Sequence, residues 1–114
     1  MPTNPTVPGP LLRLEQRPAV DGDAATLVVT GEVDMATAGA LRTALDALRA
    51  SAPDQDLRLD CAGLDFIDSS GLSVLAETRK ELARDGHRLV IANLGESQRE
   101  VFLVSGLDQV LVLE

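Results

Sequence analysis

Aromatic residues and positive charge are both scarce in this sequence. Its 114 residues include two Phe but no Tyr or Trp, and 10 Lys and Arg compare with 18 Asp and Glu, for a net charge of −8. Proteins that bind nucleic acids neutralise phosphates with Lys and Arg, and many of them stack bases on aromatic rings. The composition therefore argues against direct binding of DNA or RNA and favours docking onto another protein.

Long apolar runs and paired cysteines are also missing. No apolar stretch approaches the roughly 18 residues of a membrane-spanning helix, and the N-terminus lacks the basic and apolar pattern of a signal peptide. Cys61 is the single cysteine, so no disulfide can form within the chain. These features predict a protein of the reducing cytoplasm that does not act at a membrane.

The pattern along the chain predicts one folded domain behind a short arm. The first ten residues, MPTNPTVPGP, contain four prolines and predict a disordered arm at 1–10, with the domain at 11–114. Within the domain, apolar periodicity predicts strands at 11–17, 25–33, 56–64, 87–94 and 108–114. It predicts helices at 34–51, 70–86 and 96–106.

Two strands come first, and helices then alternate with the remaining strands. This order predicts an α/β fold with a small, mixed and mostly parallel sheet, in which an N-terminal hairpin supplies the antiparallel part. Asp34 is expected to cap the first helix. Along the second helix, an apolar stripe is expected to face the core, formed by Leu72, Leu75, Ala76 and Leu82.

A serine hydrolase would need a base beside its serine, and His87 is the only histidine. The predicted second helix separates Ser69 from His87 by about 24 Å, at roughly 1.5 Å per residue. The two side chains therefore cannot meet, which excludes a catalytic triad. The sequence predicts a binding protein and not an enzyme.

Metal and cofactor sites find equally little support. One histidine and one cysteine cannot form a zinc site. Asp60, Asp65 and Asp68 are expected near the carboxyl end of a strand, where carboxylates can hold Mg²⁺. Because Asp is also a common turn residue, ordinary turn formation is the preferred interpretation, and no metal or cofactor is expected.

The segment Asp68–Ser69–Ser70–Gly71 is the strongest candidate for a functional site. Asp and Ser favour the start of a helix, and Gly71 allows close approach of a neighbouring chain segment. The segment also lies where a strand leads into a helix at the carboxyl edge of the sheet, the usual position of functional sites in α/β folds. A helix N-terminus tolerates a phosphate. The residues alone do not distinguish Ser69 from Ser70 as the modified group.

Two motifs in this sequence resemble the STAS domain of bacterial anti-sigma factor antagonists. They are GEVD at 31–34 and FIDSSGL at 66–72, and the resemblance extends over about 11–114. It implies helices packed mainly on one face of the sheet. It also implies that the serine directly after the aspartate, Ser69, is phosphorylated by an anti-sigma factor that is an ATP-dependent serine kinase. Asp34 matches the acidic residue of the other motif, in the loop beside the phosphorylation site.

The resemblance further implies how such a switch works. The unphosphorylated protein captures the anti-sigma factor and so frees a sigma factor, phosphorylation ends the binding, and a serine phosphatase restores it. ATP and Mg²⁺ then belong to the kinase. Two alternatives are a STAS module of a transporter, lipid-trafficking or stress-sensing assembly, and a hydrolase that uses Ser69 with the nearby Asp residues.

Overall fold

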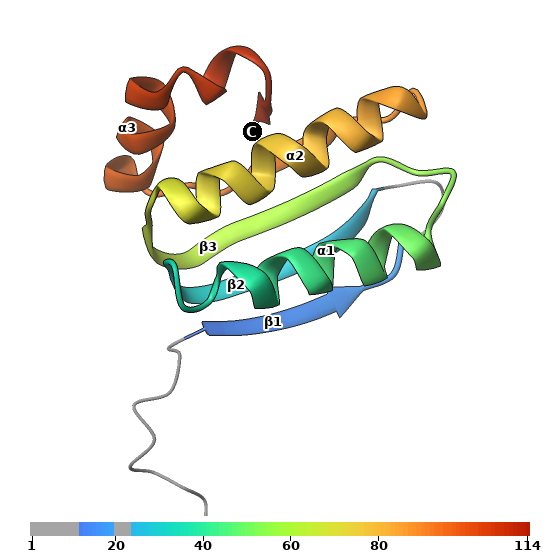
Figure 1. The fold of residues 1–114 in the computed structure, drawn as a ribbon, viewed down its shortest axis with the longest axis horizontal. Helices are drawn as coiled ribbons and strands as arrows, with labels where there is room; N and C mark the ends of the chain where they lie inside the picture. Colours follow the sequence, from blue (N-terminus) through green and yellow to red (C-terminus); the bar gives the residue numbers. More distant parts are fainter. Residues whose placement is uncertain (1–11, 20–23) are drawn as a thin grey trace, which may run out of the picture.

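The computed structural model describes residues 12–19 and 24–114. The arm predicted at 1–10 lies outside the described residues, as do Leu11 and residues 20–23. Within the described part, two strands are followed by alternating helices and strands, as predicted (Figure 1).

The five strands of the described part form one sheet in the order β1-β2-β3-β4-β5. β1 is antiparallel to β2, whereas β2 through β5 are parallel to one another. The sheet is therefore mixed and mostly parallel, which confirms the predicted fold class. The strands are β1 Leu12–Arg17, β2 Ala25–Val33, β3 Leu57–Ile67, β4 Leu89–Ala92 and β5 Val112–Leu113.

Helices α1 and α2 run side by side across one face of the sheet, and α3 lies near the start of α2 (Figure 1). A short 3₁₀ helix, η1, follows α3. The helices are α1 Ala38–Ser51, α2 Ser69–Arg84, α3 Glu96–Ser105 and η1 Leu107–Gln109. Because each parallel strand needs a crossover to the next, this sequence of elements places the starts of α1 and α2 at the same edge of the sheet.

The core between the sheet and the helices is almost entirely aliphatic. Alternate residues of β2 and β3 point into it, and α1 adds Leu41, Leu45 and Leu48, all at most 1% exposed. Phe102 is the aromatic side chain of the core. Each fully buried Leu contributes about 1.5–3 kcal/mol of transfer free energy, so the small aromatic content leaves a sufficient core.

The stripe predicted for α2 is correct in part. Leu75 and Leu82 are fully buried, but Leu72 and Ala76 are only partly buried, and Thr78 is buried in the same helix. The fully buried face of the helix is therefore narrower than the sequence indicates and includes one polar side chain.

Three of the strands have other boundaries than predicted. β3 continues to Ile67 because parallel pairing with β2 persists past a register shift at Gly31, whose φ of 109° suits only glycine. β4 is shorter than 87–94, because residues 87–88 are irregular and Asn93, directly after the strand, has a φ of 63° that an extended strand does not accommodate. The segment 108–114 is mostly 3₁₀ helix and turn, and only Val112–Leu113 pairs with β4.

Candidate functional site

The two strands at the centre of the site, β2 and β3, end side by side. Val33 and Ile67, their last residues, are paired in the parallel register. The backbone N–H of Asp68 donates a hydrogen bond to the carbonyl oxygen of Val33 at 3.1 Å. Asp34 and Asp68, which follow these two strands, are thereby brought to the same edge of the sheet.

Asp68 is the N-cap of α2. Its Oδ1 accepts hydrogen bonds from the backbone N–H groups of Ser70, at 2.8 Å, and Gly71, at 3.3 Å. Its own carbonyl accepts the first backbone bond of the helix, from Leu72. The carboxylate therefore satisfies two amides that the first turn of a helix leaves without partners.

Asp34 does not cap α1 directly, contrary to the sequence prediction. Its Oδ1 accepts from the N–H groups of Ala36, at 2.9 Å, and Thr37, at 3.1 Å, and so closes a turn that precedes the helix. The helix begins at Ala38, with Thr37 in the N-cap position. The Asp34 side chain forms this turn and does not cap the helix, because the amides two and three residues ahead of it are free to donate to its carboxylate.

Thr37 is a structural residue of this turn that the sequence analysis missed. It is only 3% exposed. Its Oγ1 donates to the carbonyl of Glu32 at 3.0 Å and accepts from the N–H of Asp34 at 2.9 Å. The turn is therefore tied to the end of β2. Its sequence signal was a threonine three residues after an aspartate, just before an apolar helical pattern.

Ser69 is the first residue of α2 and its side chain is exposed, whereas Ser70 is only partly exposed. The two serines thus differ in accessibility, although sequence reasoning without a family resemblance did not separate them. An enzyme that modifies a side chain at this edge can reach Ser69 from solvent.

Gly71 is buried against the ends of β2 and β3. A Cβ at this position would lie 2.6 Å from Val33 Cγ1 and 2.7 Å from Ile67 Cγ1. At distances this short, a side chain fits only if the Val33 and Ile67 side chains, or the helix itself, move. The glycine of the segment therefore sets how closely the start of α2 approaches the sheet.

Two large apolar side chains near the segment are exposed, which the sequence analysis did not foresee. Met35, in the turn after β2, is 83% exposed, and Phe66, near the end of β3, is 47% exposed. Strict strand alternation would turn Phe66 to the same face as the buried Leu64. Between the Gly31–Leu64 and Glu32–Phe66 pairs, β3 carries one extra residue, Asp65. This bulge changes the alternation, so Ile67 is buried in place of Phe66.

The three Asp residues considered for Mg²⁺ do not form one cluster. Asp60 lies in the first half of β3, about 25 Å of extended chain away from Asp68. Its Oδ1 accepts a hydrogen bond from Nδ2 of Asn93 at 3.1 Å, which holds the pKa of Asp60 below its ordinary value although burial acts in the opposite direction. Among residues 12–19 and 24–114, no group of three or more acidic, His or Cys side chains is placed to hold a metal.

His87 follows the far end of α2, sixteen helical residues from Asp68. Its Nδ1 lies 3.6 Å from Asp56 Oδ1. The helix thus separates Ser69 from the only imidazole of the sequence, as predicted. Across the described ranges, no helix is long and apolar enough to span a membrane.

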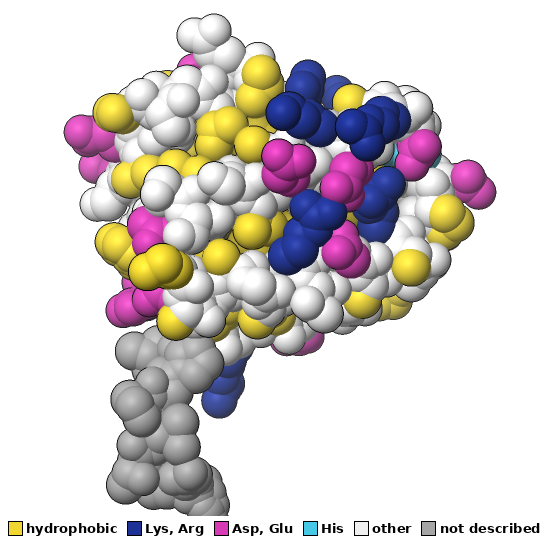
Figure 2. Space-filling model, viewed as in Figure 1, with side chains coloured by type: hydrophobic (Ala, Val, Ile, Leu, Met, Phe, Trp, Pro, Cys, Tyr) yellow, Lys and Arg dark blue, Asp and Glu magenta, His cyan; other side chains and the backbone are white. Residues whose placement is uncertain are grey.

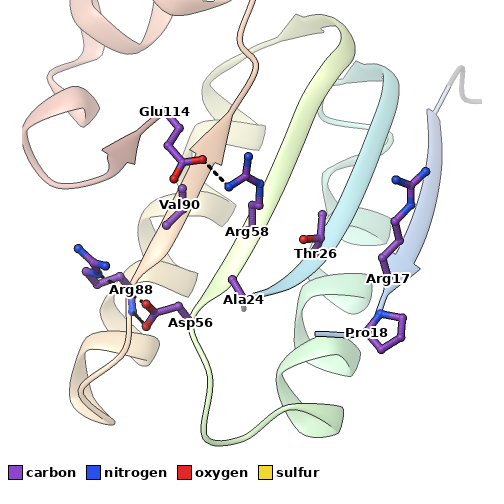
Figure 3. Close-up of a pocket in the computed structure, with 9 residues that line it drawn as sticks. All are labelled: Arg17, Pro18, Ala24, Thr26, Asp56, Arg58, Arg88, Val90 and Glu114. Carbon is purple, nitrogen blue, oxygen red and sulfur yellow. Dashed lines mark hydrogen bonds and ion pairs between the residues drawn. The ribbon is translucent and has the colours of Figure 1, made fainter. Parts of the chain in front are cut away.

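A hollow lies on the face of the sheet opposite α1 and α2 (Figure 3). It has a volume of about 700 Å³, and Arg17, Arg58 and Arg88 project from its walls. Arg58 pairs with Glu114, and Arg88 pairs with Asp56 at 3.7 Å. The acidic partners offset most of the positive charge. This hollow lies toward the starts of β2, β3 and β4, at the opposite edge from the start of α2.

Comparisons with known proteins agree with this fold and identify the family of the chain. Residues 17–114 match the family model described as "Mlab, STAS domain". The chain is 33% identical over 85 residues to the anti-sigma-F factor antagonist RsfB of Mycobacterium tuberculosis, covering 75% of this chain and 68% of the relative. It is 31% identical over 83 residues to the anti-sigma-B factor antagonist of Bacillus subtilis, covering 73% and 74%.

A solved structure extends the likeness to three dimensions. The crystal structure of an anti-sigma factor antagonist from Mycobacterium paratuberculosis superposes with a TM-score of 0.78 at 30% identity, covering 90% of this chain and 84% of that one. The α/β fold of this chain is thus shared with an anti-sigma factor antagonist. The chain belongs to the STAS domain family, among its anti-sigma factor antagonists.

Proposed function

We propose that the unphosphorylated chain binds an anti-sigma factor with serine kinase activity, and that phosphorylation of Ser69 ends this binding. The observation that carries the proposal is the exposed position of Ser69 at the first residue of α2, directly after the capping Asp68. Capture of the anti-sigma factor frees a sigma factor, and a serine phosphatase resets the switch. The chain itself supplies a binding surface, while ATP and Mg²⁺ belong to the kinase.

The hydrogen bonds of Asp68 bear on where a phosphate on Ser69 would lie. The carboxylate of Asp68 already occupies the amides of Ser70 and Gly71. A phosphate carries about −1.5 to −2 charges at neutral pH, so it is repelled by this carboxylate while the helix dipole attracts it. Because Asp68 holds these two amides and Ser69 is exposed, we expect the phosphate to project into solvent and to leave the fold intact.

The outward phosphate acts at the contact with the partner. A surface that fits a neutral hydroxyl must desolvate the dianion on binding, and such a loss reaches about 3 kcal/mol, which is more than a hundredfold in affinity. Asp34 contributes by holding the turn beside this contact, and we assign it to the surface that the kinase recognises.

The test begins with phosphorylation. Purified anti-sigma factor kinases of the source organism are incubated in turn with the chain and Mg-ATP, and the phosphate is mapped by mass spectrometry. We expect Ser69 to be the main site, Ser70→Ala to be phosphorylated like the parent, and Ser69→Ala to remain unmodified. A phosphate that maps elsewhere contradicts the proposal.

Binding is then measured by titration calorimetry with the same kinases. Ser69→Ala should bind as tightly as the parent and stay bound in the presence of Mg-ATP. Ser69→Asp should bind much more weakly, though less so than the phosphoprotein, because one carboxylate carries less charge and fewer acceptor oxygens. Both variants should unfold within about 1 kcal/mol of the parent, since only a helix start is changed. Parent-like binding of Ser69→Asp rules out the switch.

A further inference from the structure

A groove between α2 and α3 presents two partly buried apolar side chains at the margin of the core, Leu72 and Val101, together with the exposed Val104. Its volume is about 540 Å³, and it is lined by Leu72, Ser97, Glu100, Val101, Val104 and Ser105. Of the α3 residues only Phe102 is fully buried, whereas Val104 is 82% exposed. Exposed apolar side chains gathered in a concave surface are typical of protein interaction sites.

The groove opens one helical turn from Ser69. Leu72 follows Ser69 by three residues in α2, so the two side chains lie on the same face of the helix. Figure 2 shows hydrophobic side chains over the half of the helical face that holds α3 and the first turns of α1 and α2. Any protein that contacts Ser69 from this side also meets the groove.

Acidic side chains predominate around the groove, although α3 also carries the exposed Arg99 beside Glu100. The sequence has no Lys or Arg in 31–41 or 59–78, which include the ends of β2 and β3 and the first turns of both helices. Glu100 lines the groove, and Lys and Arg gather over the other half of the helical face (Figure 2). The complementary partner surface is therefore apolar, with a positive charge at its rim.

We propose that this groove receives an amphipathic helix of the anti-sigma factor, whose apolar stripe contacts Leu72, Val101 and Val104 and whose Lys or Arg pairs with Glu100. The inference rests on the proposed function and assigns its docking surface. A helix is the partner element that fits, since grooves between helices accept the apolar face of a third helix. The sheet hollow with its three Arg is not part of this contact.

This position explains how a phosphate on Ser69 interferes with docking. The modified side chain stands at the end of the groove marked by Leu72, where the partner helix is apolar. Its charge must lose water there without a cation opposite, because the partner's positive charge pairs with Glu100 on α3. Docking therefore becomes unfavourable although the groove itself is unchanged.

Neighbouring residues of α3 provide a matched test. Val104→Ser removes an apolar contact from the groove, and Leu103→Ser makes the equivalent change at a side chain that is 53% exposed and does not line the groove. In calorimetric titrations against the anti-sigma factor kinases of the source organism, Val104→Ser should raise Kd about tenfold or more. Leu103→Ser should leave Kd within about twofold. Unchanged melting temperatures establish that both variants fold.

A charge test accompanies the apolar one. Glu100→Gln should raise Kd and reduce its dependence on salt, whereas Glu77→Gln, at an exposed position of α2, should change neither. If both substitutions change Kd equally, the effect comes from the overall negative charge of the protein and not from an ion pair between Glu100 and the partner. That result would overturn the assignment of Glu100.

The outcomes separate this inference from the proposed function. If Ser69→Asp weakens binding but Val104→Ser binds like the parent, the switch stands and the groove is rejected. If the parent neither binds a kinase nor is phosphorylated by one, both fall. If Val104→Ser changes only self-association, measured by sedimentation, the occupant is a second copy of the chain and the inference is wrong.

Discussion

The amide of Asp68 donates a hydrogen bond to the carbonyl of Val33 at 3.1 Å, and this bond joins the ends of two parallel strands. It fixes the first residue before α2 against the last residue of β2. Asp34 begins its own turn at the next position. Two aspartates 34 residues apart in the sequence therefore organise adjacent helix starts, each through hydrogen bonds from its Oδ1 to backbone amides.

Gly71→Ala tests how closely α2 must approach this edge. The added Cβ would contact Val33 and Ile67 at distances below 3 Å, so we expect a loss of about 2 kcal/mol in the free energy of unfolding. Gly39, at an exposed position of α1, has no atom within 4 Å of the corresponding Cβ. Gly39→Ala should therefore stabilise the protein by about 0.5 kcal/mol. Urea unfolding of both variants checks the contrast, and equal effects would contradict it.

Asp68→Asn separates capping from charge. Asn caps helices about as well as Asp, so the melting temperature should change little, whereas Asp68→Ala should cost about 1 kcal/mol. If the carboxylate contributes to recognition, Asp68→Asn should nevertheless slow phosphorylation of Ser69 or weaken binding of the anti-sigma factor. Kinase assays and calorimetry are compared with thermal unfolding. If Asp68→Asn is phosphorylated normally but is much less stable than the parent, Asp68 acts only as a helix cap.

Glu81 connects α1 to α2 and should make stability depend on pH. Its carboxylate binds Arg42 at 2.5 Å and Arg49 at 2.9 Å. The hydrogen bond from Arg42 holds the pKa of Glu81 below its ordinary value of 4.5, against a smaller opposing effect of burial. The stabilisation is therefore complete above about pH 4.5 and is lost as the pH falls through the lower pKa of the folded state.

Glu81→Gln should accordingly lower the free energy of unfolding by about 1 kcal/mol at pH 7, because it breaks a small ion-pair network. The difference from the parent should shrink as the pH falls below 4.5. Glu77→Gln, at an exposed position of the same helix, serves as the control. Urea unfolding across this pH range measures the effect, and a difference that stays constant down to low pH would exclude the assigned linkage.

Cys61 should be unreactive in the folded protein. It is 1% exposed in β3, and burial, with a further contribution from the charge of Asp60, raises the pKa of its thiol to about 12. Because the thiolate is the reactive form, an alkylating reagent at pH 8 should label Cys61 only after denaturant unfolds the chain. Mass spectrometry of the labelled protein follows the reaction. Rapid labelling without denaturant would show that β3 opens in the native state.

Much of the fold was predictable because its signals are local. The spacing of Leu41, Leu45 and Leu48 predicts a helix, and the β-branched run at 25–33 predicts a strand, whatever surrounds them. Asp68 as a cap and Gly106 as the end of α3 follow from side-chain and backbone preferences of single residues, and the structure confirms both. The start of α1 was less predictable. Asp34 accepts hydrogen bonds from amides of the turn that precedes α1, so the helix begins later than the position of the aspartate indicates.

The sequence by itself determined the order of elements, the aliphatic core and the segment DSSG as the candidate site, since each depends on residues close together in the chain. Only the tertiary structure showed that the amide of Asp68 is bonded to Val33, directly before Asp34 in the chain. It alone also showed that a Cβ on Gly71 would meet Val33 and Ile67, and that Leu72 shares a groove with Val104. These relationships arise from strand register and helix packing. Both bring together residues that are far apart in the sequence, and the periodicity of apolar residues along the chain does not specify which of these residues meet.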